Sequence, residues 1–279
     1  MKRIETKTDN SGALAARAID STRGIVAAYI LAIAAAQAVF VFVSPVYGTV
    51  CDAALLFVLL HQAMLERARA DEEGARVRAR GDLLFASLAL VPLLQILSVT
   101  VPIPDVRSIY WYAMIGVPAA AALVVTAHLG GRDGLRRAFP FKWSRVQLLV
   151  AVTGVPLGMA AFVIARHEGL LTTRPTPHDL LVGIPLLFVF AGAYEELLFR
   201  GLLQGVFVDV LGRSGLLWGG AVFAISYLGS GSVSYLAFFA ATGLFFGWIV
   251  MRTRSLVGVV IAHGLLAVSA TLVWPYLLM

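Results

Sequence analysis

The sequence predicts an all-α, polytopic transmembrane helical bundle of about eight to nine spans. Hydrophobic residues make up 59% of its 279 residues and charged residues only 14%, whereas charged residues account for about a quarter of a typical soluble domain. The apolar residues form long runs near the roughly 20 residues that cross a bilayer. Lys and Arg cluster in the polar segments between these runs, so the net charge of +6 indicates membrane topology, with the lipid bilayer and not nucleic acid as a partner.

Nine apolar segments qualify as candidate spans, and the seventh is short and rich in glycine. They cover residues 25–43, 49–65, 83–101, 109–129, 146–165, 180–200, 216–228, 235–251 and 256–274. Trp111, Trp143 and Trp274 lie near span ends, where aromatic side chains anchor helices at the membrane interface.

Basic residues predict the orientation of the bundle. With nine spans, the basic segments 66–80, 131–145 and 252–254 fall on the same side as the basic N-terminal residues. The opposite connections are nearly free of Lys and Arg, except for Arg166 and Arg174. The positive-inside rule then places the N-terminus in the cytoplasm. Enrichment in Ala, Arg, Gly and Val is typical of a GC-rich bacterium, so we expect an integral protein of the bacterial inner (plasma) membrane.

The chain divides into three predicted segments. Residues 1–23 are polar and of mixed charge, which predicts a flexible N-terminal tail and not a cleaved signal peptide. Residues 24–171 form the N-terminal transmembrane helices, which have few charges in their interiors. A loop rich in Pro and polar residues separates them from residues 179–275, which carry most of the ionisable groups found within spans. The single cysteine, Cys51, excludes an internal disulfide.

Two adjacent glutamates and an arginine interrupt the apolar stretch AYEELLFRG at residues 193–201. Ionisable side chains inside a span are costly and usually face the bundle interior or water. Glu196 and Arg200 are four residues apart, so on a helix they share a face and can pair. Glu195 points about 100° away and is free to act. The alternative interpretation is that this helix end reaches the membrane interface, where the charges mark it and Arg200 snorkels.

Two later segments offer partners for these charges. The sequence FAISY places Phe223 and Tyr227 four residues apart, and His263 lies inside an otherwise apolar run. Taken alone, His263 is equally consistent with a hydrogen-bonded polar residue between helices. With two glutamates in an earlier span, a shared site becomes the more attractive hypothesis.

These motifs resemble the CPBP family of intramembrane proteases, also called the CAAX prenyl protease 2 or Abi family. Glu195 to Arg200 match its EExxxR motif, and Phe223 to Tyr227 and His263 to Ala267 lie where FxxxH and HxxxN are expected. The resemblance covers about residues 180–274. It implies that Glu195 activates a water molecule, that Glu196, Arg200 and Phe223 position the site, and that His263 stabilises the oxyanion.

The departures from the family pattern are as informative as the matches. Tyr227 replaces the second-motif histidine and Ala267 replaces the third-motif asparagine. A phenol with an ordinary pKa of about 10 cannot act as the missing base, but it can donate a hydrogen bond to the water or the oxyanion, so Tyr227 is a candidate catalytic residue beside Glu195 and His263. Family members are often labelled metalloproteases, but a catalytic zinc takes three protein ligands. One of the two glutamates is expected to pair with Arg200, so we expect no metal and no other cofactor.

Three functions follow from these residues. The first is an intramembrane endopeptidase that cuts a membrane protein or peptide near a membrane-embedded or C-terminal segment. The second is a catalytically impaired homologue that binds or scaffolds membrane proteins. The third is a proton-relaying transporter, which needs ionisable residues along a path through the membrane. Asp52, His61 and His128 show no linking pattern, so this third hypothesis ranks last, and no pattern specifies an oligomeric state.

Overall fold

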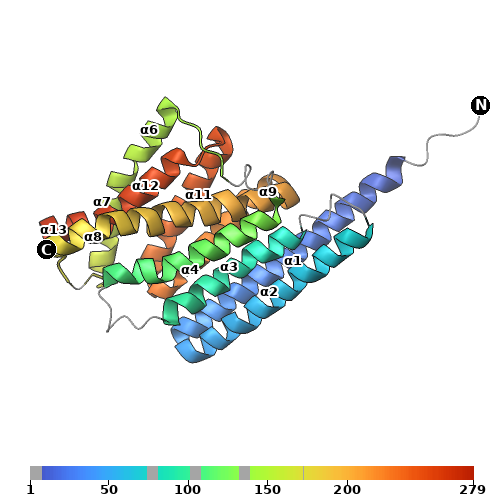
Figure 1. Ribbon diagram of the computed structural model, residues 1–279, viewed down its shortest axis with the longest axis horizontal. Helices are drawn as coiled ribbons and strands as arrows, with labels where there is room; N and C mark the ends of the chain where they lie inside the picture. The colour runs from blue at the N-terminus through green and yellow to red at the C-terminus, as the bar shows by residue number, and fades with distance from the viewer. Residues whose placement is uncertain (1–7, 74–80, 101–107, 132–138, 172) are drawn as a thin grey trace, which may run out of the picture.

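The computed structural model describes residues 8–73, 81–100, 108–131, 139–171 and 173–279, with the side chains of residues 8–21, 70–73 and 108 excepted. Every regular element in these ranges is a helix, which confirms the all-α bundle (Figure 1). The first described turn of α1 and the C-terminal α13 lie at opposite ends of the bundle (Figure 1). The cytoplasmic location of the N-terminus stays a prediction.

The N-terminal part is a row of four long helices (Figure 1). They are α1 (Thr8–Phe42), α2 (Pro45–Glu73), α3 (Gly81–Thr100) and α4 (Ser108–Leu129), and α2 packs between α1 and α3. Residues 8–23, which fall in the predicted N-terminal tail, are helical and continue α1 toward the N-terminus; residues 1–7 lie outside the described residues. The Ala-rich sequence between Ser11 and Asp20 explains this helix, since alanine is the strongest helix former.

The fifth span consists of α6 (Arg145–Val152) and α7 (Gly154–His167), which meet at Thr153. The next helix begins sharply at Pro177, because Thr176 and Asp179 form a reciprocal capping box with the backbone. It continues through α8 (Pro177–Leu187), the π-helical segments η3 (Phe188–Tyr194) and η4 (Leu197–Leu203), and α9 (Gln204–Leu211). Gly212, with φ of 70°, ends it in a conformation that glycine adopts readily.

The chain then folds back on itself. The 3₁₀ turn η5 (Gly212–Ser214) leads into α10 (Gly215–Ser226), followed by η6 (Leu228–Ser230) and α11 (Val233–Thr253). The last span is built from α12 (Val257–Val268), η7 (Ser269–Val273) and α13 (Trp274–Leu278).

The described residues contain eight helical stretches that are long and apolar enough to cross a membrane, in line with the predicted eight to nine spans. The predicted spans 180–200 and 216–228 belong to a single stretch, Pro177–Ser230, which reverses direction at Gly212. Within it, α10 has only 12 residues and is about 18 Å long, well short of the roughly 30 Å hydrocarbon core.

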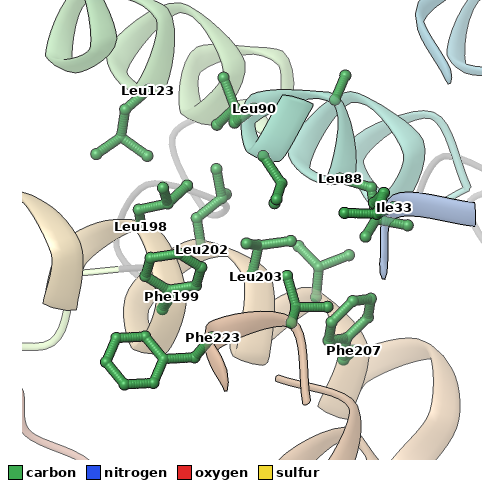
Figure 2. Packing of buried hydrophobic residues seen from close by; sticks show 14 of the residues in the cluster. Ile33, Leu88, Leu90, Leu123, Leu198, Phe199, Leu202, Leu203, Phe207 and Phe223 are labelled. Atoms are coloured by element: carbon green, nitrogen blue, oxygen red, sulfur yellow. The ribbon is translucent and has the colours of Figure 1, made fainter. Parts of the chain in front are cut away.

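The core lies where η4 and α9 pass between the N-terminal helices and α10. Figure 2 shows Ile33, Leu88, Leu90 and Leu123 of the N-terminal helices facing Leu198, Leu202, Leu203, Phe207 and Phe223. Large apolar side chains on the outside of the bundle are exposed, including Leu31, Phe57, Leu149 and Leu181. Such a surface is expected where helices face lipid.

Close packing of η3 against α12 gives a first testable prediction. A Cβ atom added to Gly192 would lie 2.6 Å from the Cα atom of Gly264, which is backbone and cannot move aside. Gly192→Ala is therefore expected to lower the free energy of unfolding by about 1–3 kcal/mol, measured by denaturant unfolding in mixed micelles. Gly205→Ala is the control, because nothing lies within 4 Å of the Cβ atom that alanine would add there. Equal stability of both variants would contradict this helix contact.

Candidate active site

The two glutamates stand between two π-helical segments. Glu195 and Glu196 separate η3 from η4, in a helix that is otherwise α-helical. A π-helix, in which hydrogen bonds join residues i and i+5, is rare in proteins. Where one occurs, it is often at a functional site. The predicted pairing of Glu196 with Arg200 was based on the geometry of a regular α-helix. The two side chains also come into contact in the wider turn of the π-helix.

Glu196 is the centre of a buried polar cluster. Its Oε1 atom lies 2.8 Å from Nη1 of Arg200 and 2.7 Å from Nδ1 of His263, and its side chain is fully buried. The predicted pairing of Glu196 with Arg200 is therefore present. Because an ionised carboxylate only accepts hydrogen bonds, the Nδ1 atom of His263 carries the hydrogen. This fixes the imidazole ring and directs its Nε2 atom toward Glu195, whose Oε2 atom is 3.9 Å away.

Arg200 contacts two aromatic rings in addition to its carboxylate partner. Its guanidinium carbon lies 3.8 Å from the centre of the Phe223 ring and 5.9 Å from that of Phe246. Neither Nη atom is aligned for a hydrogen bond with a described residue, so the contact with Glu196 is an ion pair without a directed hydrogen bond. A cation over a ring face is attracted by the π electrons. The first residue of the second motif, Phe223, thus supports the arginine of the first.

Glu195 differs from its neighbour because it is not fully buried. Its side chain is 22% exposed, and its Oε2 atom accepts a 2.9 Å hydrogen bond from the hydroxyl of Tyr227. The Oε1 atom makes no hydrogen bond to any residue that the structure describes. One carboxylate oxygen is therefore held in place and the other remains available to a water molecule or a substrate.

Glu195, Tyr227 and His263 converge on a cavity of about 520 Å³. Ala267 also lines this cavity, so the position of the expected asparagine faces it with only a methyl group. The ring of Tyr227 is fixed by stacking on Phe239, with 3.8 Å between ring centres and planes inclined by 6°.

Part of the cavity wall comes from helices to which the sequence assigned no chemistry. Gln37 of α1, Gln95 of α3, and Trp111 and Tyr112 of α4 line the same space as Glu195. Trp111, predicted to be an interfacial anchor, lines the cavity. The adjacent Trp111–Tyr112 pair was the only sequence signal, and it resembles the aromatic pairs found at many span ends.

The donors at the site do not fit a metal ion. Within the described ranges, no three or more His, Cys, Asp or Glu side chains are grouped so as to hold one. The Nδ1 atom of His263 and Oε1 of Glu196 are engaged with each other, and Oε1 also contacts Arg200. Of this cluster, only Glu195 and the Nε2 atom of His263 face the cavity with free capacity, fewer than the three ligands of a catalytic zinc.

Residues 177–269 match the family model described as type II CAAX prenyl endopeptidase Rce1-like. The match runs from the first residue of α8 into η7, and it includes both glutamates, Arg200, Tyr227 and His263. It confirms the resemblance to the CPBP family and supports a CAAX-type protease at the family level. No curated protein and no solved structure was found to match the chain.

Proposed function

Taking the CPBP-type core as the premise, we propose that the chain is an intramembrane endopeptidase in which Glu195 activates the attacking water. One observation carries the proposal: Glu195 presents a free carboxylate oxygen to a cavity that is also lined by Tyr227 and His263. The substrate is a membrane protein or peptide, cut near a membrane-embedded or C-terminal segment. We place the enzyme in the bacterial inner membrane and assign it no cofactor.

In the proposed reaction, the Oε1 atom of Glu195 takes a proton from water while the water oxygen bonds to the scissile carbonyl carbon. Tyr227 holds Oε2, so the carboxylate cannot rotate away from the water. As the tetrahedral intermediate collapses, the C–N bond breaks and Glu195 returns the proton to the leaving amine. The products are a carboxylic acid and an amine, and the enzyme regains its starting state.

His263 is proposed to stabilise the oxyanion through Nε2. Since Nδ1 already donates to Glu196, Nε2 carries a hydrogen only when the ring is an imidazolium. In that state Arg200 and His263 balance the charges of Glu195 and Glu196, so the cluster is neutral overall. A buried cluster without net charge avoids much of the cost of desolvating an unpaired ion. Arg200 holds Glu196 in place, and Glu196 in turn keeps the His263 ring oriented with Nε2 toward Glu195.

Two features favour a slow enzyme, or the alternative of a catalytically impaired homologue that binds membrane proteins. Ala267 offers no hydrogen-bond donor at the cavity wall, and the loss of one oxyanion donor typically costs about 10²–10³ in rate. Tyr227 donates a hydrogen bond to Glu195 but, as a phenol, supplies no second base for the attacking water.

Glu195→Gln tests the proposal. The substitution keeps the size of the side chain and removes the base, so cleavage is expected to fall by about 10²–10⁴-fold. New protein N-termini would be compared by mass spectrometry in membranes that contain the wild type or the variant. Substrates found in this way would then be cleaved by purified protein in liposomes. Glu168→Gln is the matched control, since Glu168 is exposed beyond the end of α7.

Cleavage at the wild-type rate by the Glu195→Gln variant would disprove the assigned base. If neither protein generates new N-termini, the binding homologue becomes the better account. That alternative predicts that a cellular phenotype of the gene survives the Glu195→Gln change.

A further inference from the structure

The residues that line the Glu195 cavity come from the same end of the bundle. They include Gln37 and Phe40 near the end of α1, Val99 at the end of α3, and Trp111 near the start of α4. These helix ends lie toward the side of the bundle where α13 also lies (Figure 1). The cavity therefore belongs to one half of the bundle and is not centred between its two ends.

The opposite end of the bundle carries basic residues, and we call it the basic end. Arg67 lies near the end of α2, Arg145 begins α6, and Arg252 lies in the last turn of α11. The starts of α6 and α12 are joined there, because the hydroxyl of Ser255 donates a 2.8 Å hydrogen bond to the carbonyl oxygen of Lys142. The positive-inside rule predicts that the basic end faces the cytoplasm.

The cavity is closed toward the basic end by packed aromatic rings. On α11, Phe239 lines the cavity, and Phe246, which is nearer the basic end, is fully buried. On α10, Tyr227 lines the cavity, and Phe223 is buried one turn nearer the basic end. The ring centres of Phe223 and Phe246 each lie 6.1 Å from that of His263. These rings form a floor, so a substrate cannot approach Glu195 through them.

The rim at the other end of the cavity is exposed and uncharged. Val99 and Gly229 of η6 line the cavity and are exposed, and Glu195 is itself partly exposed. Among the described residues that line the cavity, Glu195 and His263 are the only Asp, Glu, Lys, Arg or His side chains, and they lie together at the floor. The rim includes the rings of Phe40, Trp111 and Tyr235. Such a rim favours an apolar segment.

Two arginines at this end are exceptions to the charge pattern, and the structure gives each of them a local role. Arg166 donates a 3.1 Å hydrogen bond to the carbonyl oxygen of Leu278, and Arg174 donates two hydrogen bonds to that of Tyr276. Both carbonyls lie in α13, and the last carbonyls of a helix lack helical partners. Basic side chains are favourable there. Arg166 and Arg174 thus cap the last helix and do not argue for a cytoplasmic location of this end.

We propose that the cavity opens on the non-cytoplasmic side of the membrane and that its substrate is an apolar polypeptide segment presented from that side. The inference deepens the proposed function and rests on it for the cleavage of this segment. A segment unwound for cleavage must satisfy its backbone groups, and water entering through the exposed rim supplies partners that lipid does not. The substrate class is therefore a membrane or exported protein whose scissile segment has already crossed the membrane.

Cysteine labelling tests the direction of opening without cleavage. Cys51→Ala leaves a chain without cysteine, into which Val99→Cys or Gly229→Cys is introduced at the rim. A Cβ atom added at Gly229 has no atom within 4 Å, so this variant is expected to fold. Ser144→Cys is the matched control, because Ser144 is exposed at the start of α6 and its side chain makes no capping hydrogen bond.

Spheroplasts keep the cytoplasmic membrane closed, so a charged maleimide reaches the non-cytoplasmic side alone. We expect both rim cysteines to be labelled in spheroplasts, and Ser144→Cys to be labelled only after the membranes are opened. The reverse pattern would overturn the proposal. Rim cysteines that stay unlabelled even in opened membranes would also overturn it, because water would then not enter the cavity.

The positions of the cleavage sites test the substrate class. Sites that are lost in the Glu195→Gln variant are expected to lie in non-cytoplasmic segments of their proteins. A bulky maleimide attached to Gly229→Cys in spheroplasts is expected to abolish this cleavage by blocking the rim. Glu195-dependent sites in cytoplasmic segments would contradict the proposal. If no Glu195-dependent site is found, the protease function fails, whereas the direction of opening is still decided by the labelling.

Discussion

Arg200→Leu is expected to lower the free energy of unfolding by about 3–5 kcal/mol, the usual cost of leaving one member of a buried ion pair alone. Glu196 is fully buried and lies 2.8 Å from this arginine, so its carboxylate would lose its permanent cation. The substitution also removes the guanidinium that covers the face of Phe223. Denaturant unfolding in mixed micelles measures the loss.

Arg252→Leu is the matched control, because Arg252 is an exposed residue in the last turn of α11. Its stability is expected to stay close to that of the wild type. Removing both charges, in Glu196→Gln with Arg200→Met, is expected to recover part of the lost stability, since no unpaired ion remains. If Arg200→Leu is as stable as Arg252→Leu, the ion pair does not hold the helix in place.

Tyr227→His combined with Ala267→Asn is expected to raise the cleavage rate by about 10²–10³-fold, the typical contribution of one oxyanion donor. Both positions line the cavity with Glu195, so the new imidazole and carboxamide would face the reacting atoms. The rate is measured on a substrate identified by its dependence on Glu195. Each single substitution serves as a control for the other.

A double variant that cleaves no faster than the wild type would contradict the view that these two positions limit the rate. A gain confined to Tyr227→His would instead assign the limitation to water activation. A gain confined to Ala267→Asn would assign it to the oxyanion.

The all-α membrane bundle could be predicted because long apolar runs and the basic segments between them mark whole helices in the sequence. Of the nine apolar segments, residues 180–200 and 216–228 belong to one helical stretch, Pro177–Ser230. The turn at Gly212 and the 12 residues of α10 depend on how neighbouring helices pack, which hydropathy does not record. The first residues of α1 were assigned to a tail because they are polar, although their alanine content favours a helix.

The site residues that the sequence revealed were the ones whose side chains are energetically costly to place inside a membrane span. Charged side chains within a span are rare, so Glu195, Glu196 and Arg200 stood out, and the resemblance then led to Tyr227 and His263. Gln37 carries no charge and no sequence pattern marked it, whereas Trp111 was noted only as an aromatic residue near a span end. Their position at the cavity follows from the packing of α1 and α4 near η3 and η6, which are distant in sequence.

The π-helical segments beside the glutamates determine where one residue can be deleted from this helix without reorienting Glu195. A hydrogen bond from i to i+5 encloses one residue more than the α-helical bond does. If one residue were deleted within η3, that stretch could rewind as α-helix and keep Glu195 facing the same way. The same deletion in α8, where no extra residue is stored, would turn the carboxylate by about 100°. Between the capping box at Thr176 and the glutamates, η3 thus absorbs the deletion of one residue, which would otherwise turn the Glu195 carboxylate out of its cavity.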